Sequence, residues 1–94
     1  MTNSLPPYIT LSPDVLFQEL EDEAILLNIT SENYYGLDDV GLRIWQLLEE
    51  HDGETELVIS QMQAEYHVDE ALLRDDITNL MAELSEAGLV TMGQ

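Results

Sequence analysis

The stretch Asn33–Leu48 reads NYYGLDDVGLRIWQLL and changes from a strand pattern to a helix pattern in its middle. Its first residues favour a strand, whereas from Asp39 onward apolar residues recur at helical spacing. Gly36 gives the backbone freedom between the two. Asp38 or Asp39 suits the start of the helix, because a carboxylate accepts hydrogen bonds from its unpaired N–H groups. We therefore predict β structure before this stretch and α structure after it.

The chain before Asn33 holds short β-prone segments separated by polar turns. The turn at Glu21-Asp22 joins two of them into a hairpin, and the turn at residues 30–32 leads into a third antiparallel strand. The third strand has no later strand to cover it. Its edge, which carries no lysine and no proline, is therefore expected to stay unpaired. The predicted strands are Tyr8–Leu11, Val15–Leu20, Glu23–Ile29 and Asn33–Leu37.

Three helices are predicted after the sheet, separated by short polar turns. Thr55 is placed to cap the second helix and Asp69 the third, because each side chain accepts N–H bonds at a helix start. The third helix is expected to end at Gly88 in a Schellman arrangement, with Leu89 against Leu84. Strands beside two helices joined by a tight turn predict an α+β winged helix-turn-helix, a three-stranded antiparallel sheet followed by three helices.

The first helix, predicted over Asp39–Glu50, carries three further expectations. Asp39 precedes Arg43 by four residues, the favourable order for an acid–base pair on a helix. Gly41 costs about 1 kcal/mol relative to alanine inside a helix, so another element is expected to approach it closely. Trp45 repeats with the apolar residues of this helix, which favours packing, either in the core or against a partner, over a chemical role.

The charge of the chain is strongly one-sided. Twenty acidic residues stand against Arg43 and Arg74, with no lysine, which gives a formal net charge of −18. Such a surface repels nucleic acids and anionic membranes and attracts basic partners. The third helix, which would enter the DNA groove in a winged helix-turn-helix, is itself acidic around Arg74. We therefore expect neither nucleic-acid binding nor membrane binding.

The length of 94 residues predicts one domain with a single modest core, over residues 8–94. A flexible arm is expected over residues 1–7. The chain has no cysteine, its first residues lack the basic region of a signal peptide, and no apolar run approaches the roughly 20 residues of a membrane span. We predict a cytoplasmic protein.

The sequence offers little for catalysis. His51 and His67 both fall in predicted helix-end turns, where solvent or helix carbonyls are the expected partners. The chain has no nucleophile elbow and no glycine-rich phosphate loop, and its acidic clusters lack the spacing of a calcium loop. We predict no catalytic residue, no cofactor site and no metal site.

An unpaired strand edge beside an apolar helix suits the docking of an extended peptide. Main-chain hydrogen bonds at the third strand would give affinity, and pockets between strand and helix would select side chains. Tyr34 and Tyr35 point to opposite faces of this strand. The sequence leaves open which ring faces a peptide, and whether both are ordinary strand residues.

Four motifs occur in a characteristic order in this short chain: Tyr34–Leu37, the acidic step into Val40-Gly41, the helix around Ile44–Leu48, and an acidic third helix that ends in Glu86–Val90. With this order, the chain resembles the PqqD-like family, the peptide-recognition elements of pathways for ribosomally made, modified peptides (RiPPs). The resemblance covers most of the chain. Its length is similar to that of the stand-alone recognition elements of lasso-peptide pathways.

The resemblance implies that the chain binds the leader of a precursor peptide. The leader would lie as a strand against the third β-strand and over the third helix, and be presented to a separate leader peptidase and cyclase. The helix leucines would accept apolar or aromatic side chains, and Asp76 with the general negative field would favour a lysine-rich leader. The implied peptide-binding residues are Asn33, Tyr34, Tyr35, Gly36, Leu37, Leu72, Leu73, Asp76 and Leu80.

Three other hypotheses stay open. A PqqD-type chaperone would deliver its peptide to a radical enzyme of quinone-cofactor biosynthesis. An acidic carrier protein with a phosphopantetheine arm agrees with the size and charge, but the β-rich first third and the lack of an Asp-Ser-Leu helix start argue against it. An acidic mimic of nucleic acid would bind a DNA-binding protein tightly.

Overall fold

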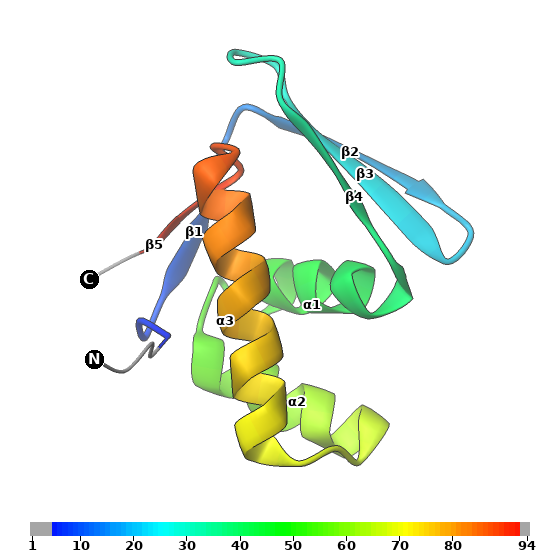
Figure 1. Cartoon of the computed structure of the whole chain (residues 1–94), viewed down its shortest axis with the longest axis vertical. Coiled ribbons are helices and arrows are strands. Elements are labelled where there is room, and N and C mark those ends of the chain that lie inside the picture. The colour runs from blue at the N-terminus through cyan, green and yellow to red at the C-terminus, as the bar shows by residue number, and fades with distance from the viewer. Residues whose placement is uncertain (1–4, 93–94) are drawn as a thin grey trace.

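The computed structural model describes residues 5–92, which form two antiparallel sheets and three helices (Figure 1). The predicted α+β winged helix-turn-helix is confirmed, while residues 1–4 of the predicted arm lie outside the described residues. Over the described range, no helix has the length and apolar character needed to cross a membrane. The elements are β1 (Ile9–Leu11), β2 (Val15–Leu20), β3 (Glu23–Asn28), β4 (Tyr34–Leu37), α1 (Asp39–Glu50), α2 (Thr55–Tyr66), α3 (Glu70–Glu86) and β5 (Val90–Met92).

The three-stranded sheet has the order β2-β3-β4 and is antiparallel throughout. Its side chains alternate between two faces, as the period of a strand requires. Leu26 and Leu37 are buried in the core, whereas Leu16, Ile25 and Tyr34 project from the outer face into solvent. Within residues 5–92, β4 pairs with β3 alone, so the edge of the sheet predicted to be unpaired is free.

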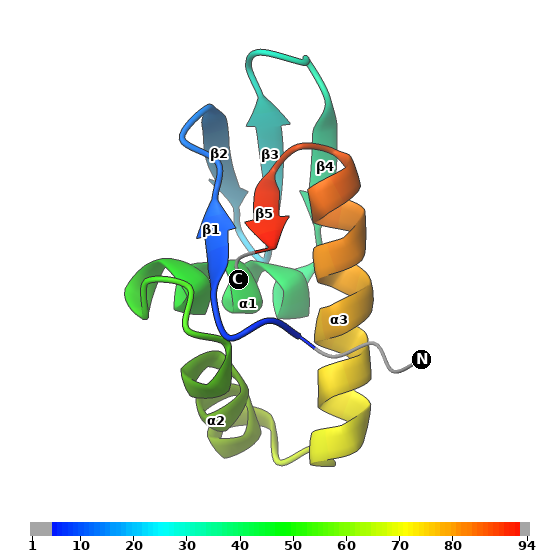
Figure 2. The same ribbon diagram turned by 90° about the vertical axis from the view of Figure 1, so that its left-hand side faces the viewer.

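A second sheet brings together the two ends of the described chain. β1 pairs with β5, with Leu11 opposite Val90. The sequence predicts the first of these strands but gives it no partner. Figure 2 shows the pair in front of the three-stranded sheet and beside α3. Ile9 and Val90 are buried, so this pair extends the core and leaves the edge of β4 uncovered.

The start of α1 is fixed by a side-chain cap and a close contact. Asp38 Oδ1 accepts a hydrogen bond from the N–H of Gly41 at 2.8 Å. A Cβ atom at Gly41 would lie 3.1 Å from Leu37 Cδ2, so the close approach expected there is confirmed. Trp45 is 3% exposed and stacks on Phe17 with ring centroids 6.5 Å apart. Of the two packing positions left open by the sequence, Trp45 therefore takes the one in the core.

Two predicted side-chain interactions are wrong. Arg43 does not pair with Asp39. Its guanidinium reaches Glu65 on α2, with Nε 2.8 Å from Oε1 and Nη2 2.5 Å from Oε2, and this two-bond geometry is stronger than a single surface contact. Thr55 is the first residue of α2 and not its cap, and its hydroxyl donates to the carbonyl of Pro6 at 2.8 Å. This bond ties the start of the described chain to α2.

Both ends of α3 follow the predicted pattern. Asp69 caps the first turn, where its Oδ2 accepts a hydrogen bond from the N–H of Leu72 at 3.1 Å. At the other end Gly88 has φ +76°, and the N–H of Leu89 donates to the carbonyl of Leu84 at 2.8 Å. These are the features of a Schellman ending. The cap and the ending fix where α3 starts and stops beside the sheet.

Replacement of Gly53 by alanine is expected to destabilise the fold strongly. Gly53 has φ +81°, and a Cβ atom there would lie 1.9 Å from the carbonyl oxygen of Ile9. The strain of a left-handed backbone and the cost of a clash with the main chain add together. Gly53→Ala should therefore lower the free energy of unfolding, measured by urea titration, by about 3 kcal/mol. Gly36→Ala is the matched control, because its Cβ meets no atom within 4 Å. Equal stability of the two variants would contradict this account of Gly53.

Candidate functional site

Side-chain hydrogen bonds join the three-stranded sheet to α3 near the C-terminal end of the helix. At the C-terminal end of α3, the side-chain amide of Asn28 donates to the carbonyl of Gly88 at 2.7 Å. The amide of Asn33 makes a longer contact of 3.5 Å with the carbonyl of Ala87. From this end α3 and the sheet diverge, and α1 lies across the opening (Figure 1). The free edge of β4 therefore faces the region between α1 and α3.

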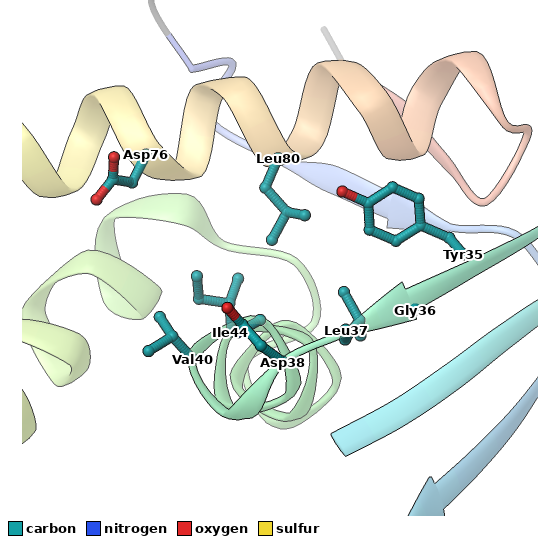
Figure 3. A pocket seen from close by; sticks show the side chains of 9 residues that line it. Tyr35, Gly36, Leu37, Asp38, Val40, Ile44, Asp76 and Leu80 are labelled. Atoms are coloured by element: carbon teal, nitrogen blue, oxygen red, sulfur yellow. Dashed lines mark hydrogen bonds between the residues drawn. The ribbon is translucent and has the colours of Figure 1, made fainter. Parts of the chain in front are cut away.

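A groove of about 450 Å³ occupies this space, and we call it the β4–α3 groove. Leu80 of α3 and Val40 and Ile44 of α1 give it apolar walls (Figure 3). Asp38 and Asp76 add one carboxylate from each side. Apolar walls with a few polar groups are typical of sites that bind side chains of a ligand.

The lining of the β4–α3 groove includes more than half of the predicted peptide-binding residues. Those that line it come from β4 and α3, which are distant in sequence: Tyr35, Gly36, Leu37, Asp76 and Leu80.

The other predicted residues do not line this groove. Leu73 is buried in the core, and Leu72 is 59% exposed on α3. Tyr34 projects from the outer face of the sheet and is 76% exposed, while Asn33 lies just before β4. The structure therefore answers which tyrosine faces the groove: Tyr35 does.

The sequence analysis missed the contribution of the first turns of α1 to the groove. Helical spacing marks Val40 and Ile44 as apolar, but it does not separate core residues from groove residues. Asp38 and Gly41 were assigned to capping and close packing, which they also perform. Only the angle between α1 and α3 places these residues around the opening.

The hydrogen bonds of the hairpin show which main-chain groups of β4 point to its free edge. The N–H of Asn28 donates to the carbonyl of Asn33 at 2.8 Å, so these two residues form a hydrogen-bonded pair. Hydrogen-bonded and non-hydrogen-bonded pairs alternate along an antiparallel ladder. In the observed register, Tyr35 therefore bonds toward β3, while the N–H and C=O groups of Tyr34 and Gly36 point outward. An added strand would pair with these outward groups.

Tyr35 closes one end of the groove. Its hydroxyl donates a hydrogen bond to the carboxylate of Glu83, which links β4 to α3. This hydrogen bond, followed by burial of the ring and the negative charge of Glu83, raises the pKa of Tyr35 to about 12. The hydroxyl therefore keeps its proton, and with it the hydrogen bond to Glu83, to a higher pH than an ordinary tyrosine would.

The Tyr35–Glu83 bond gives the fold a predicted alkaline pH dependence. Because the folded-state pKa of about 12 exceeds the usual value of 10.0, its stabilisation is complete below pH 10 and is lost as the pH rises toward 12. Unfolding free energies measured from pH 8 to 12 should fall more steeply for the wild type than for Tyr35→Phe, which lacks the hydroxyl. Parallel curves for the two proteins would contradict the bond.

The groove carries binding groups more than catalytic ones. His51 and His67 lie at the C-terminal ends of α1 and α2, as predicted, and neither lines the groove. The polar side chains of the lining are two carboxylates and a tyrosine already bonded to Glu83. Together with outward main-chain groups on β4, this arrangement can hold an extended chain and select its side chains.

Comparison with known proteins assigns the family. Residues 23–90, which include β3, β4 and all three helices, match the family described as coenzyme PQQ synthesis protein D (PqqD). The chain belongs to the PqqD family. The resemblance seen in the sequence is thereby confirmed, whereas no curated protein matches this PqqD-family chain significantly.

A solved structure shares the fold over almost the whole length. It is described as TbiB1 in complex with the TbiA(beta) leader peptide, and it superposes on this chain with a TM-score of 0.83 at 33% sequence identity. The match covers 90% of this chain and 98% of that one. A relative of similar size and fold therefore binds a leader peptide.

Proposed function

We propose that this PqqD-family chain binds the leader region of a ribosomally made precursor peptide. The leader adds as a strand to the free edge of β4, and alternate side chains enter the β4–α3 groove. The observation that carries this proposal is an unpaired strand edge that opens directly onto an apolar groove. The TbiB1 complex supports it, because that relative of this chain holds a leader peptide.

The proposed site divides its residues by role. Tyr34 and Gly36 supply outward main-chain groups, and Leu80 supplies an apolar wall. Leu73 supports the wall from within the core, while exposed Leu72 extends the apolar surface along α3. The proposed peptide-binding residues therefore remain Asn33, Tyr34, Tyr35, Gly36, Leu37, Leu72, Leu73, Asp76 and Leu80.

In this proposal the chain is an adaptor without catalytic activity. It presents the bound leader to a leader peptidase and a cyclase of a lasso-peptide pathway. Trp45 is buried and is not the surface that meets them. The outer face of the three-stranded sheet suits this role better, because it exposes Leu16, Ile25 and Tyr34 beside the proposed leader strand.

A second candidate keeps the same site but changes the client. The description of the matched family names coenzyme PQQ synthesis. This favours a chaperone that carries its peptide to a radical enzyme of quinone-cofactor biosynthesis. The two candidates differ in the precursor and in the enzymes that receive it. The genes next to this one distinguish them.

Fluorescence polarisation with a labelled leader tests the proposal. The probe is the N-terminal half of the short precursor peptide encoded nearest to this chain, titrated at low and at moderate salt. Saturable binding that weakens only in part with salt is expected, since apolar contacts and strand pairing are less sensitive to screening than exposed charges. A folded sample that does not bind this leader at either salt concentration would overturn the proposal for that peptide.

A further inference from the structure

A second cavity lies against the free edge of β4, on the outer face of the three-stranded sheet. It measures about 420 Å³, and the exposed residues that line it include Ile25 of β3 and Tyr34 of β4. We call it the outer hollow. The residues that line both the outer hollow and the β4–α3 groove are the last two of β4 and the one that follows: Gly36, Leu37 and Asp38. The free edge of β4 therefore has a cavity on each of its two faces.

The outer hollow lies where β4 has no side chain on this face. Gly36 pairs with Ile25 of β3, and a Cβ atom at Gly36 would meet no atom within 4 Å. Ile25 is 40% exposed, and Tyr34, two residues before Gly36 on the same face, is largely exposed. The glycine thus leaves the two apolar side chains beside it uncovered.

A leader strand paired with β4 would place side chains on both faces of the sheet, because successive side chains of a strand point to opposite faces. Those beside Tyr35 and Leu37 would enter the β4–α3 groove. Those beside Tyr34 and Gly36 would lie on the outer face, next to the residues whose main-chain groups point to the free edge. The leader residue opposite Gly36 is therefore the one whose side chain meets the outer hollow.

The width of the outer hollow favours a large side chain. Neighbouring strands lie about 4.8 Å apart, so the main chain of the leader would run about 10 Å from that of β3. A small leader side chain cannot reach Ile25 across Gly36. An aromatic ring can lie flat over the glycine and contact Ile25, and such rings pair favourably with β-branched residues and with other rings across a sheet. The ring of Tyr34 borders the same place.

We propose that the outer hollow is a subsite for one aromatic side chain of the leader, that of the residue opposite Gly36. The ring lies over Gly36 and contacts Tyr34 and Ile25. This inference rests on the proposed leader binding and adds a specificity on the face of the sheet away from the groove. β2 lies on the far side of β3 (Figure 2), so its exposed Leu16 and Leu20 stay uncovered by the ring.

A double-mutant cycle between leader and protein tests the subsite. In the labelled leader, each aromatic residue is replaced in turn by alanine, and every peptide is titrated against wild type, Ile25→Ala and Leu20→Ala. Leu20 makes the matched control, because it is an aliphatic residue of the outer face that is 42% exposed and does not line the outer hollow. Urea titrations check that both variants are folded.

Ile25→Ala is expected to weaken binding of the native leader about fivefold, against less than about twofold for Leu20→Ala. For one aromatic position, the alanine peptide should bind wild type and Ile25→Ala equally well, which identifies the ring that meets Ile25. Tyr34→Ala changes an exposed side chain and should couple to the same position. It decides the outcome if Ile25→Ala does not fold.

Strand alternation adds a second requirement. A leader position that couples to Leu80→Ala, in the groove, must lie an odd number of residues from the position that couples to Ile25→Ala. An even separation would put both side chains on one face and would overturn the subsite. If wild type binds the native leader but no aromatic residue of it couples to Ile25 or Tyr34, the subsite is wrong and the leader site stands. If wild type binds no leader, both proposals fall.

Discussion

Gly36→Pro is expected to weaken leader binding by at least about thirtyfold, which corresponds to about 2 kcal/mol. The N–H of Gly36 points to the free edge of β4, so proline removes a donor that an added strand needs and puts a ring in its path. The fold should tolerate the change. Gly36 does not have a left-handed backbone, and a Cβ there meets no atom within 4 Å.

Gly36→Ala is the control for this prediction, because it adds a Cβ and keeps the N–H. It should bind the labelled leader within about threefold of wild type, and both variants should unfold in urea near the wild-type midpoint. Tyr35→Pro is a poorer test, since the N–H of Tyr35 points toward β3 and its loss would damage the sheet. Tight binding by folded Gly36→Pro would exclude pairing at this edge.

Local sequence signals predicted most of the fold. The strand-to-helix change at Asn33–Leu48, the Asp69 cap and the Schellman ending at Gly88 each depend on residues close together in the chain. Such features follow from backbone preferences and capping chemistry, which act over a few positions. The free edge of β4 was also predictable, because no later strand is available to cover it in the three-stranded sheet.

Contacts between distant segments were less predictable. Arg43 has an acidic neighbour four residues away, yet it binds Glu65 on the next helix, where two hydrogen bonds form at once. Thr55 has the chemistry of a cap, but its hydroxyl binds the carbonyl of Pro6, distant in sequence. In both cases the local partner competes with a tertiary one that no periodicity reveals.

The β4–α3 groove likewise has a part that could be predicted and a part that depends on contacts between distant segments. The resemblance to the PqqD-like family assigned Leu80 and Asp76 to the facing helix, but the part of α1 that completes the groove was not assigned. Val40 and Ile44 differ little from core residues in sequence, because apolar walls of a groove follow the same helical spacing. The angle at which α3 leaves the sheet makes one stretch of an ordinary apolar face into a wall of the groove.

Leu80→Lys is expected to abolish detectable leader binding, with a loss of at least about tenfold. The half-buried Leu80 side chain forms the α3 wall of the groove opposite Val40 and Ile44. Lysine removes apolar contact area and puts a positive charge into the apolar wall of the groove. Its long stem can carry the charge to solvent, so the free energy of unfolding should fall by only about 1 kcal/mol.

Two other leucine-to-lysine variants test whether the loss of leader binding is specific to the position of Leu80. Leu57→Lys changes an exposed leucine of α2 that does not line the groove, and it should bind the leader within about twofold of wild type. Leu72→Lys measures how far the site reaches along α3. Since Leu72 does not line the groove, we expect a smaller loss than for Leu80→Lys. Full binding by a folded Leu80→Lys variant would remove this face of α3 from the site, and would leave strand pairing at β4 as the main source of affinity.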